Sequence, residues 1–254
     1  MICLNSVVFD YKFSICTLVN NLIEYEGMVS SFKNSGFNDD CRFFYIDNIF
    51  GNAFDAYDGI NNFLTHSRSE YIIISHQDVS LDFDGYDQLL AVIDGMNKHD
   101  PKWAVLGNAG YYDFNTKLIR ITDPYGQDQN SKNLPEKTKS LDENFLVIKK
   151  AANLSLSRNI GGFHFYGTDL CVIARILGWN AYVVDFHVRH KGKGNIDSEF
   201  YKAKNRFIDK YSKVVKYFSI RTTCDMLVVT GFKFINKILN KKLIYSIVKR
   251  LQRI

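Results

Sequence analysis

Short apolar runs separated by polar segments mark the first third of the chain. Runs at residues 13–19, 41–46 and 71–75 are predicted to be strands, and the last is typical of a strand buried on both faces of a parallel sheet. The segments between them, which run to about Ser35 and over residues 53–66, are predicted to be helical, and Gly36 would end the first helix. This β-α-β-α-β order predicts an α/β fold with a mostly parallel central sheet flanked by helices.

The same element types continue through the middle of the chain. Helices are predicted over residues 85–97, 167–178 and 197–218, with Thr168 as the cap of the second helix. Strands are predicted over residues 103–107, 118–122, 145–148 and 180–186. The polar and glycine-containing segments 123–140 and 187–194 are predicted to be loops. We therefore expect residues 1–220 to form one domain.

Residues 221–254 are expected to form a basic, amphipathic helical tail. Between Phe232 and Ile254 there are seven basic residues and no acidic residue, and apolar residues recur every four positions from Ile235 to Leu251. Basic amphipathic helices commonly lie on anionic membrane surfaces. A helix packed against the domain, or a homodimer contact, is the alternative explanation.

The net charge of +5 comes from this tail. Without its seven basic residues, the chain holds 25 basic residues against 27 acidic ones, so the body is close to neutral. A neutral body without a recognised binding motif argues against nucleic acid as a partner.

Several features favour a cytoplasmic location. The chain contains no run of about 18 apolar residues, as a membrane span requires, and its start lacks the pattern of a secretory signal peptide. The five cysteines are scattered and form no CxxC pair, which predicts neither a zinc knuckle nor a disulfide framework. They are expected to be small core residues in a reducing compartment.

Polar side chains follow each of the first three predicted strands. These are Asn20-Asn21, Asp47-Asn48 and His76-Gln77-Asp78. Because ligands bind beyond the carboxyl ends of strands in open α/β sheets, we expect a ligand site where these segments meet. Neither a GxGxxG sequence after the first strand nor a GxxxxGK[ST] sequence is present, which argues against a Rossmann dinucleotide site and a P-loop.

Four segments together resemble those of a known family. They are residues 74–79 (Ile-Ser-His-Gln-Asp-Val), residues 107–110 (Gly-Asn-Ala-Gly), residues 163–169 (Phe-His-Phe-Tyr-Gly-Thr-Asp) and residues 187–194 (His-Val-Arg-His-Lys-Gly-Lys-Gly). Between residues 13 and 194 the chain resembles the GT-A glycosyltransferases, and specifically the bacterial family-2-like enzymes with His-Gln-Asp-Val in place of Asp-x-Asp. The resemblance implies a GT-A-like fold that binds a nucleotide-sugar donor.

The resemblance also implies roles for the strand ends. The donor nucleotide would lie against the first strand ends and the triplet, that is, against Thr17, Val19, Asn20, Asp47, Asn48, His76 and Gln77. Asp78 would be the ligand of a divalent metal, Mn²⁺ or Mg²⁺, because a hard cation with oxygen ligands offsets the charge of a diphosphate leaving group. His190 is a second metal ligand or a donor to the diphosphate. Lys191 and Lys193 would contact phosphate, or else form a solvated basic loop.

An inverting transfer also needs a base for the acceptor hydroxyl. Asp169, in the first turn of the predicted helix, is the expected base, although the helix dipole alone would favour an Asp there. Asp142 and Glu143 are the alternative base, acceptor-binding groups, or surface charges. His164 and Tyr166 are expected to line the acceptor pocket, or else to pack in the core.

The resemblance therefore implies a hexosyltransferase that moves a sugar from a nucleotide-sugar donor to a hydroxyl of a glycan acceptor. A lipid-linked acceptor in bacterial surface polysaccharide synthesis would explain the basic tail, which would hold a cytoplasmic enzyme on the inner face of the membrane. The alternative is a non-catalytic nucleotide- or glycan-binding module, since the triplet lacks the first Asp. A nucleotidyltransferase is disfavoured because no Gly-rich loop bearing Lys or Arg follows the first strand.

Overall fold

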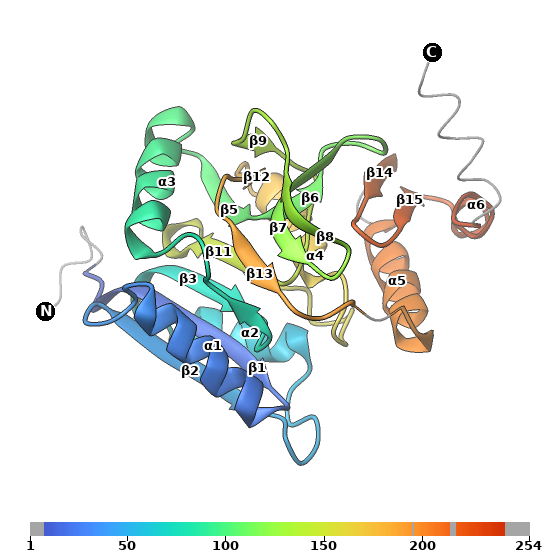
Figure 1. The fold of residues 1–254 in the computed structure, drawn as a ribbon. Helices are drawn as coiled ribbons and strands as arrows, with labels where there is room; N and C mark the ends of the chain where they lie inside the picture. Colours follow the sequence, from blue (N-terminus) through green and yellow to red (C-terminus); the bar gives the residue numbers. More distant parts are fainter. Residues whose placement is uncertain (1–7, 195, 214–216, 242–254) are drawn as a thin grey trace, which may run out of the picture.

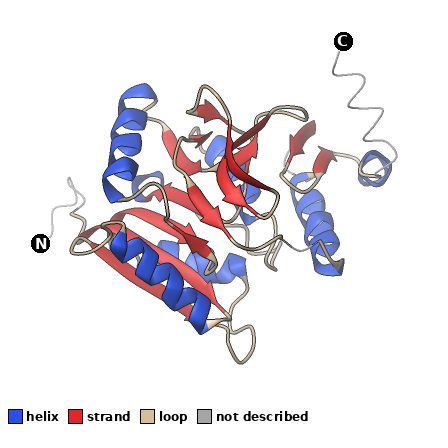
Figure 2. Cartoon of the chain, in the orientation of Figure 1, coloured by secondary structure: helices blue, strands red, loops and turns tan. Residues whose placement is uncertain are grey.

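The computed structural model describes residues 8–194, 196–213 and 217–241. Its centre is a seven-stranded mixed sheet with helices on both faces (Figures 1 and 2). The strand order is β2 (Cys41–Asp47), β1 (Tyr11–Val19), β3 (Ser69–Ser75), β11 (Phe145–Lys149), β5 (Trp103–Gly107), β12 (Asn180–Val183) and β9 (Glu136–Lys137). Strands β1, β2 and β3 are parallel, as predicted, whereas β11 is antiparallel to both of its neighbours. The polar ends of the first three strands therefore reach one edge.

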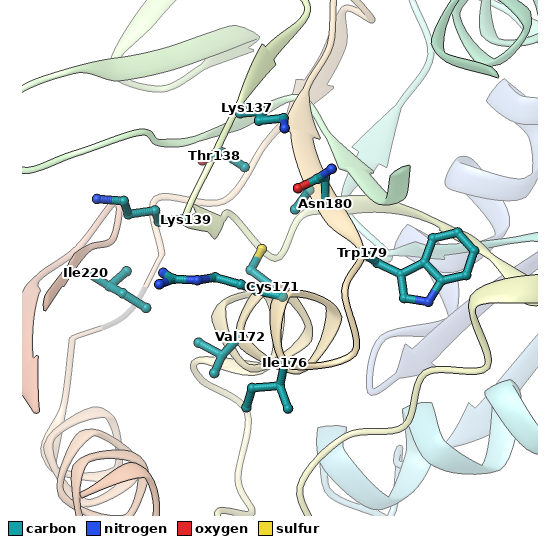
Figure 3. A pocket seen from close by; sticks show the side chains of 11 residues that line it. Lys137, Thr138, Lys139, Cys171, Val172, Ile176, Trp179, Asn180 and Ile220 are labelled. Atoms are coloured by element: carbon teal, nitrogen blue, oxygen red, sulfur yellow. The ribbon is translucent and has the colours of Figure 1, made fainter. Parts of the chain in front are cut away.

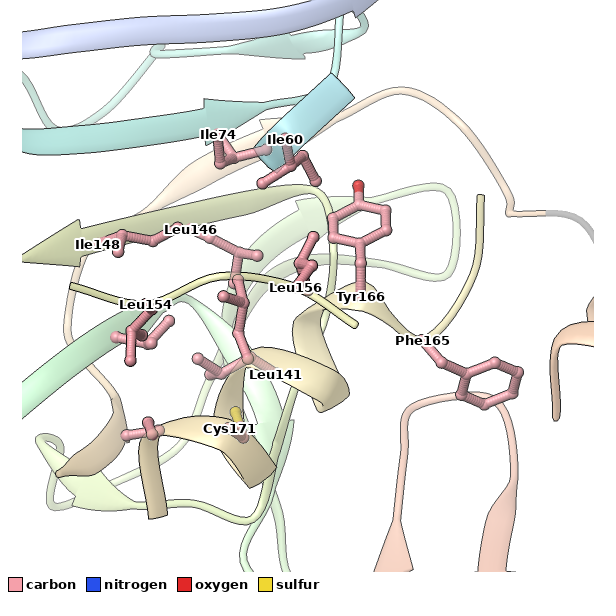
Figure 4. Packing of buried hydrophobic residues seen from close by; sticks show 14 of the residues in the cluster. Ile60, Ile74, Leu141, Leu146, Ile148, Leu154, Leu156, Phe165, Tyr166 and Cys171 are labelled. Atoms are coloured by element: carbon pink, nitrogen blue, oxygen red, sulfur yellow. The ribbon is translucent and has the colours of Figure 1, made fainter. Parts of the chain in front are cut away.

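Helices cover both faces because the side chains of the strands alternate. Ile15 of β1 packs in one apolar cluster with residues of α1 (Leu22–Asn34) and α3 (Tyr86–His99). Its neighbour Cys16 packs in the other cluster, with residues of α2 (Ala56–His66), α4 (Tyr166–Ile176) and α5 (Ser198–Tyr211). Figure 4 shows part of this second cluster, including Ile60, Ile74 and Leu146. The two clusters fix the sheet between its helices.

A second sheet lies beside the first and was not expected from the sequence. Its order is β10 (Ser140–Leu141), β6 (Ala109–Tyr111), β7 (Lys117–Asp123), β13 (Val188–His190) and β4 (Val79–Ser80), and β8 (Gly126–Asn130) pairs with β7. The prediction of loops over residues 123–140 and 187–194 was therefore wrong, since these segments contain β8, β9, β10 and β13. These strands are short, and several are polar, so backbone pairing forms them without an apolar pattern.

The C-terminal part differs most from the prediction. Helix α5 ends at Tyr211, and a hairpin of β14 (Tyr217–Arg221) and β15 (Met226–Thr230) follows where helix was expected. The expected boundary at residue 220 falls inside β14. Leu227 and Val229 lie in the same core cluster as α4 and α5, so the hairpin packs as part of the domain.

The expected tail contains a single short helix in the part that is described. This is α6 (Lys233–Leu239), and residues 242–254 lie outside the described part of the chain. No helix among the described residues is long and apolar enough to cross a membrane.

Candidate active site

Three side chains with metal-binding atoms meet just beyond the end of β3. His190 Nε2 lies 3.3 Å from Asp78 Oδ1 and 3.5 Å from His76 Nδ1. One ligand atom from each of the three residues lies within 4.8 Å of the other two, so the group could hold a metal ion. They meet because β4, which directly follows Asp78, pairs with β13 and places His190 opposite Val79. The expected ligands Asp78 and His190 thus lie together, and His76 joins them.

The charges of this cluster are mutually dependent. Burial alone would raise the pKa of Asp78 and lower that of His190, but their shared hydrogen bond and charges lower the Asp78 pKa and raise the His190 pKa. Burial and the neighbouring His190 lower the pKa of His76. These shifts favour the ionised form of Asp78, the protonated form of His190 and the neutral form of His76.

Hydrogen bonds behind His76 orient its ring toward the cluster. The Tyr166 hydroxyl donates its one proton to the Glu143 carbonyl (3.0 Å), so it must accept from His76 Nε2–H (2.8 Å). The neutral ring then carries its lone pair on Nδ1, the atom that faces His190. A hydrogen bond from the other ring nitrogen, which fixes the tautomer, is typical of a metal-binding histidine. The donor set of two imidazoles and one carboxylate therefore fits a transition-metal ion better than Mg²⁺.

Gly192 closes the cluster from the side of the loop after β13. A Cβ atom at this position would lie 2.5 Å from Asp78 Oδ2 and 3.4 Å from His190 Nε2. The Lys191 N–H also donates to the Asp78 carbonyl at 3.1 Å. Only glycine lets this loop approach the carboxylate so closely.

Gln77 has a structural place in the triplet. Its Oε1 accepts from the backbone N–H groups of Asn20 and Asn21, at 2.9 and 3.0 Å. Its Nε2 donates to Asn20 Oδ1 and to Glu24 Oε2. These bonds join the end of β3 to the end of β1 and the start of α1, so the side chain expected to contact a nucleotide is already occupied.

The other expected nucleotide contacts lie at one edge but differ in exposure. The side chains of Thr17 and Val19 are buried, and that of Asn48 is buried and bonded through both of its polar atoms to Phe54. Asp47 lies opposite Val19 in the β1–β2 pairing and is exposed, with one oxygen accepting from the Ile49 N–H. Asp47 therefore offers an accessible polar side chain to a ligand.

A cavity of about 420 Å³ opens beside the cluster. His76 and His190 line it together with Asp142, Glu143 and Lys193. The remaining lining includes aromatic side chains and the β14–β15 turn, namely Tyr125, Phe163, His164, Phe165, Phe200, Thr222, Thr223 and Cys224. A cavity of this size and mixed lining suits a small polar ligand.

Glu143 presents a carboxyl group to this cavity at the start of α4. Burial and the neighbouring Asp142 raise the pKa of Glu143 to about 8, although the N–H of Gly167 donates to its Oε1 at 3.3 Å. Gly167 permits this contact because a Cβ atom there would lie 2.6 Å from the Leu141 carbonyl oxygen. A carboxyl group with a pKa near neutrality has the protonation behaviour of a general acid or base.

The chain has a clear relative, although no family model matches it. The protein "ATP synthase subunits region ORF 6" of Fuscovulum blasticum is 35% identical over 208 residues, which cover 79% of this chain and 84% of that protein. The chain belongs to the family of this protein. That name specifies no reaction.

Solved structures show the fold. The mannosyltransferase PcManGT from Pyrobaculum calidifontis, in complex with GDP-Man and Mn²⁺, superposes with a TM-score of 0.55 at 10% identity, over 85% of this chain and 68% of that chain. GalNAc-T7 with UDP, GalNAc and Mn²⁺ gives a TM-score of 0.48 at 8% identity, over 72% of this chain but only 44% of that chain. The predicted GT-A-like fold is confirmed.

Within this GT-A fold, Asp169 is placed away from the cavity that holds Glu143. The carboxylate is fully buried and accepts hydrogen bonds from the Ser157 N–H, the Ser157 hydroxyl and the Tyr211 hydroxyl at 2.5–2.8 Å. It joins the segment before α4 to α5. This placement speaks against the base role expected of Asp169. Thr168, the expected cap, lies inside α4, which begins after Phe165 in the left-handed region at φ 68°.

The expected acceptor and phosphate residues are only partly brought together. His164 and Lys193 line the cavity, as do Asp142 and Glu143. Tyr166 is buried behind His76, is hydrogen-bonded to it, and is not among the residues that line the cavity. Lys191 is exposed on the loop over Asp78.

Sequence reasoning missed Gly192, Tyr125 and the β14–β15 turn as parts of the site. Gly192 was visible only as one glycine in a glycine-spaced loop. Tyr125 lay in a segment expected to be a loop, and its hydroxyl donates to the Lys193 carbonyl at 2.6 Å. The turn lay in the segment expected to be a helical tail.

A second cavity shares no lining residue with this site. It measures about 210 Å³ and lies between α4, β12 and residues 137–139 (Figure 3). Its lining is mainly apolar, with Val172, Ile176 and Ile220, and carries no titratable cluster like that at Asp78. It is therefore separate from the candidate active site.

Proposed function

We propose that the chain is a hexosyltransferase that moves a sugar from a nucleotide-sugar donor to a hydroxyl of a glycan acceptor. The observation that supports this most directly is that His76, His190 and Glu143 face one cavity beside Asp78, at the carboxyl edge of the parallel strands. The fold is shared with a mannosyltransferase solved with GDP-Man and Mn²⁺, which favours a similar donor here.

The donor diphosphate would lie over the metal-binding cluster. His76, Asp78 and His190 would hold a divalent cation, Mn²⁺ in preference to Mg²⁺, and when bound it would offset the charge that develops on the leaving diphosphate. Lys191 and Lys193 add positive charge on the adjoining loop. The nucleoside would extend toward Asp47, along the ends of β1 and β2.

Glu143 is the base in this proposal. For an inverting transfer, the acceptor oxygen bonds to the anomeric carbon as the bond from that carbon to the diphosphate breaks, and the hydroxyl proton passes to the Glu143 carboxylate. Hydrogen bonds from the start of α4 stabilise the ionised form, and burial keeps its pKa high enough to accept a proton near pH 8. Asp142, which lines the same cavity, would bind acceptor hydroxyls.

Aromatic side chains form the acceptor end of the cavity. Phe163, Tyr125 and His164 are among the residues that line the cavity. Their ring faces suit the apolar face of a sugar, while Asp142 suits its hydroxyl groups. The acceptor would be lipid-linked, and the setting would be polysaccharide assembly by a cytoplasmic enzyme on an anionic membrane surface. The basic C-terminal segment is the feature that supports this setting.

A thermal-shift screen of nucleotide sugars with and without Mn²⁺ tests the proposal. A donor at about 100 times its Kd should raise the free energy of unfolding by about 2.7 kcal/mol, or about 5–10 °C in Tm for a chain of this size. We expect this shift to need Mn²⁺ and to disappear in Asp78→Asn. Equal shifts in both proteins would remove the assigned metal site.

The non-catalytic module remains distinguishable from the enzyme. A binding module would show the same thermal shift but release no nucleoside diphosphate from the bound donor. The presence of Glu143 in the cavity, with its raised pKa, favours the enzyme.

A further inference from the structure

Amide side chains hold helix α6 against the edge of β15. The Asn236 side chain accepts from the Thr230 N–H at 2.7 Å and donates to the Thr230 carbonyl at 3.0 Å. One turn later, the Asn240 side chain makes the same pair of bonds with Val228, at 2.9 and 2.6 Å. The two amides satisfy the backbone of a strand edge as a neighbouring strand would.

This attachment leaves most apolar side chains of the segment facing outward. Leu239 packs inward on Phe114, Met226 and Val228. By contrast, Phe232 and Phe234 are 69% and 75% exposed, and Ile235 and Ile238 are 40% and 38% exposed. Helical spacing puts Phe234 and Ile238 opposite Asn236. An amphipathic helix normally buries such residues, so α6 presents its apolar ridge to a partner outside the described chain.

Lysines accompany the exposed apolar residues Phe234 and Ile238 in a sequence segment without acidic residues. Lys233, Lys237 and Lys241 lie on the same segment, and the sequence contains no acidic residue after Asp225. A second copy of this face would bring lysines against lysines. An anionic surface with an apolar interior matches both the charge and the exposed rings.

We propose that Phe232–Lys241 is a bilayer-docking segment, in which Phe234 and Ile238 enter the interface of an anionic membrane and the lysines contact its headgroups. This deepens the membrane setting proposed above and rests on it only for its biological purpose. The hydrogen bonds of Asn236 and Asn240 to β15 fix the direction in which Phe234 and Ile238 point. These side chains could therefore enter the membrane without a change of fold.

The docking segment is connected directly to the active-site cavity. Strand β15 joins α6 to the turn Thr222–Cys224, which lines the cavity. Five residues of strand span about 17 Å. Figure 1 shows the hairpin and α6 together on the side of the molecule away from α1 and β2. Docking would therefore bring the acceptor end of the cavity near the bilayer, which suits an acceptor with a lipid anchor.

Vesicle co-sedimentation of the full chain tests the proposal, without donor or acceptor. We expect binding to phosphatidylcholine vesicles that contain phosphatidylglycerol and little binding to phosphatidylcholine alone. Phe234→Ser should weaken binding about tenfold through loss of the inserted ring. Phe50→Ser is the matched control, because Phe50 is 99% exposed on a loop without flanking lysines, and it should bind as the unmodified chain does.

Charge makes a second arm of the test. Replacing Lys233, Lys237 and Lys241 by Gln should weaken the affinity for anionic vesicles about fivefold per lysine. Because residues 242–254 are also basic, Phe234→Ser decides whether α6 itself docks. Unchanged vesicle binding in Phe234→Ser would overturn the proposal. The proposal would also be overturned if light scattering showed that Phe234→Ser converts a dimer of the chain to a monomer. Because no transfer is measured, failure here is separate from failure of the proposed reaction.

Discussion

Gly192 is the residue on which the metal-binding geometry depends most closely. Gly192→Ala would place a Cβ atom 2.5 Å from Asp78 Oδ2, so the carboxylate or the loop must move. We expect Mn²⁺ affinity, measured by calorimetry, to fall by about 10- to 100-fold, as for other changes next to metal ligands. Gly95→Ala is the control, because a Cβ atom there meets nothing within 4 Å. Equal affinities in the two variants would contradict the role of Gly192.

Glu143 should determine the alkaline dependence of turnover. A base acts in its ionised form, and the pKa of Glu143 is raised to about 8, so kcat/KM should rise with pH up to about 8 and then level off. Glu143→Gln should lower kcat by about 100-fold or more and abolish this rise. A variant that keeps the same pH profile would exclude Glu143 as the base.

Asp169 should matter for stability rather than for proton transfer. Asp169→Ala removes the carboxylate that accepts hydrogen bonds from the buried Ser157 N–H and from the Tyr211 hydroxyl. The free energy of unfolding should fall by about 2–4 kcal/mol, which denaturant titration would measure. If Asp169 were the base, turnover would instead be lost at unchanged stability.

At the scale of single residues, the sequence predicted which residues lie together near the end of β3 better than it predicted the hydrogen-bond partners of each side chain. The polar triplet after β3 was expected to form part of a ligand site, and Asp78 and His190 were expected together, as they are in the structure. Gln77 and Asn48 were expected on the nucleotide, yet their amides hold loops in place. The residue type alone cannot distinguish these uses, because an amide serves a backbone and a ligand equally well.

At the scale of elements, long apolar runs were predicted well and short paired strands were not. The core strands β1, β3 and β5 were found because burial on both faces demands continuous apolar residues. Strands such as β8 and β9 have exposed, polar residues. Their partners come from distant segments, which a local pattern does not reveal. The same holds for β13, and hence for the meeting of His190 with Asp78.

The attachment of α6 gives a prediction of its own. Asn236→Ala removes the partner of the buried Thr230 N–H, so local opening should become easier by about 1–3 kcal/mol. Hydrogen exchange at the Thr230 and Val228 amides should then accelerate. Asn52→Ala, an exposed position outside this contact, should leave both rates unchanged. Unchanged exchange in Asn236→Ala would show that the amide does not hold the helix.

At the scale of the whole molecule, the sheet edge proposed to bind the nucleotide and the cavity proposed to bind the acceptor meet at the cluster of His76, Asp78 and His190. The strand order of the central sheet forms this edge. The second sheet and the β14–β15 hairpin form walls of the cavity. The fold class followed from the sequence because it depends on the apolar pattern. The walls of the cavity could not be predicted in this way, because they come from segments whose structure depends on packing against the rest of the domain.

The most direct measurement is Mn²⁺-dependent release of nucleoside diphosphate from a panel of nucleotide sugars. The intact chain should release it from one donor class and should need Mn²⁺. In Asp78→Asn the release rate should fall by about 100-fold or more, because the anionic metal ligand is lost. Asp87 is an exposed carboxylate on α3, and Asp87→Asn should leave the release rate unchanged. Equally fast release in Asp78→Asn would contradict the proposed reaction. So would a failure to release nucleoside diphosphate from every donor in the panel.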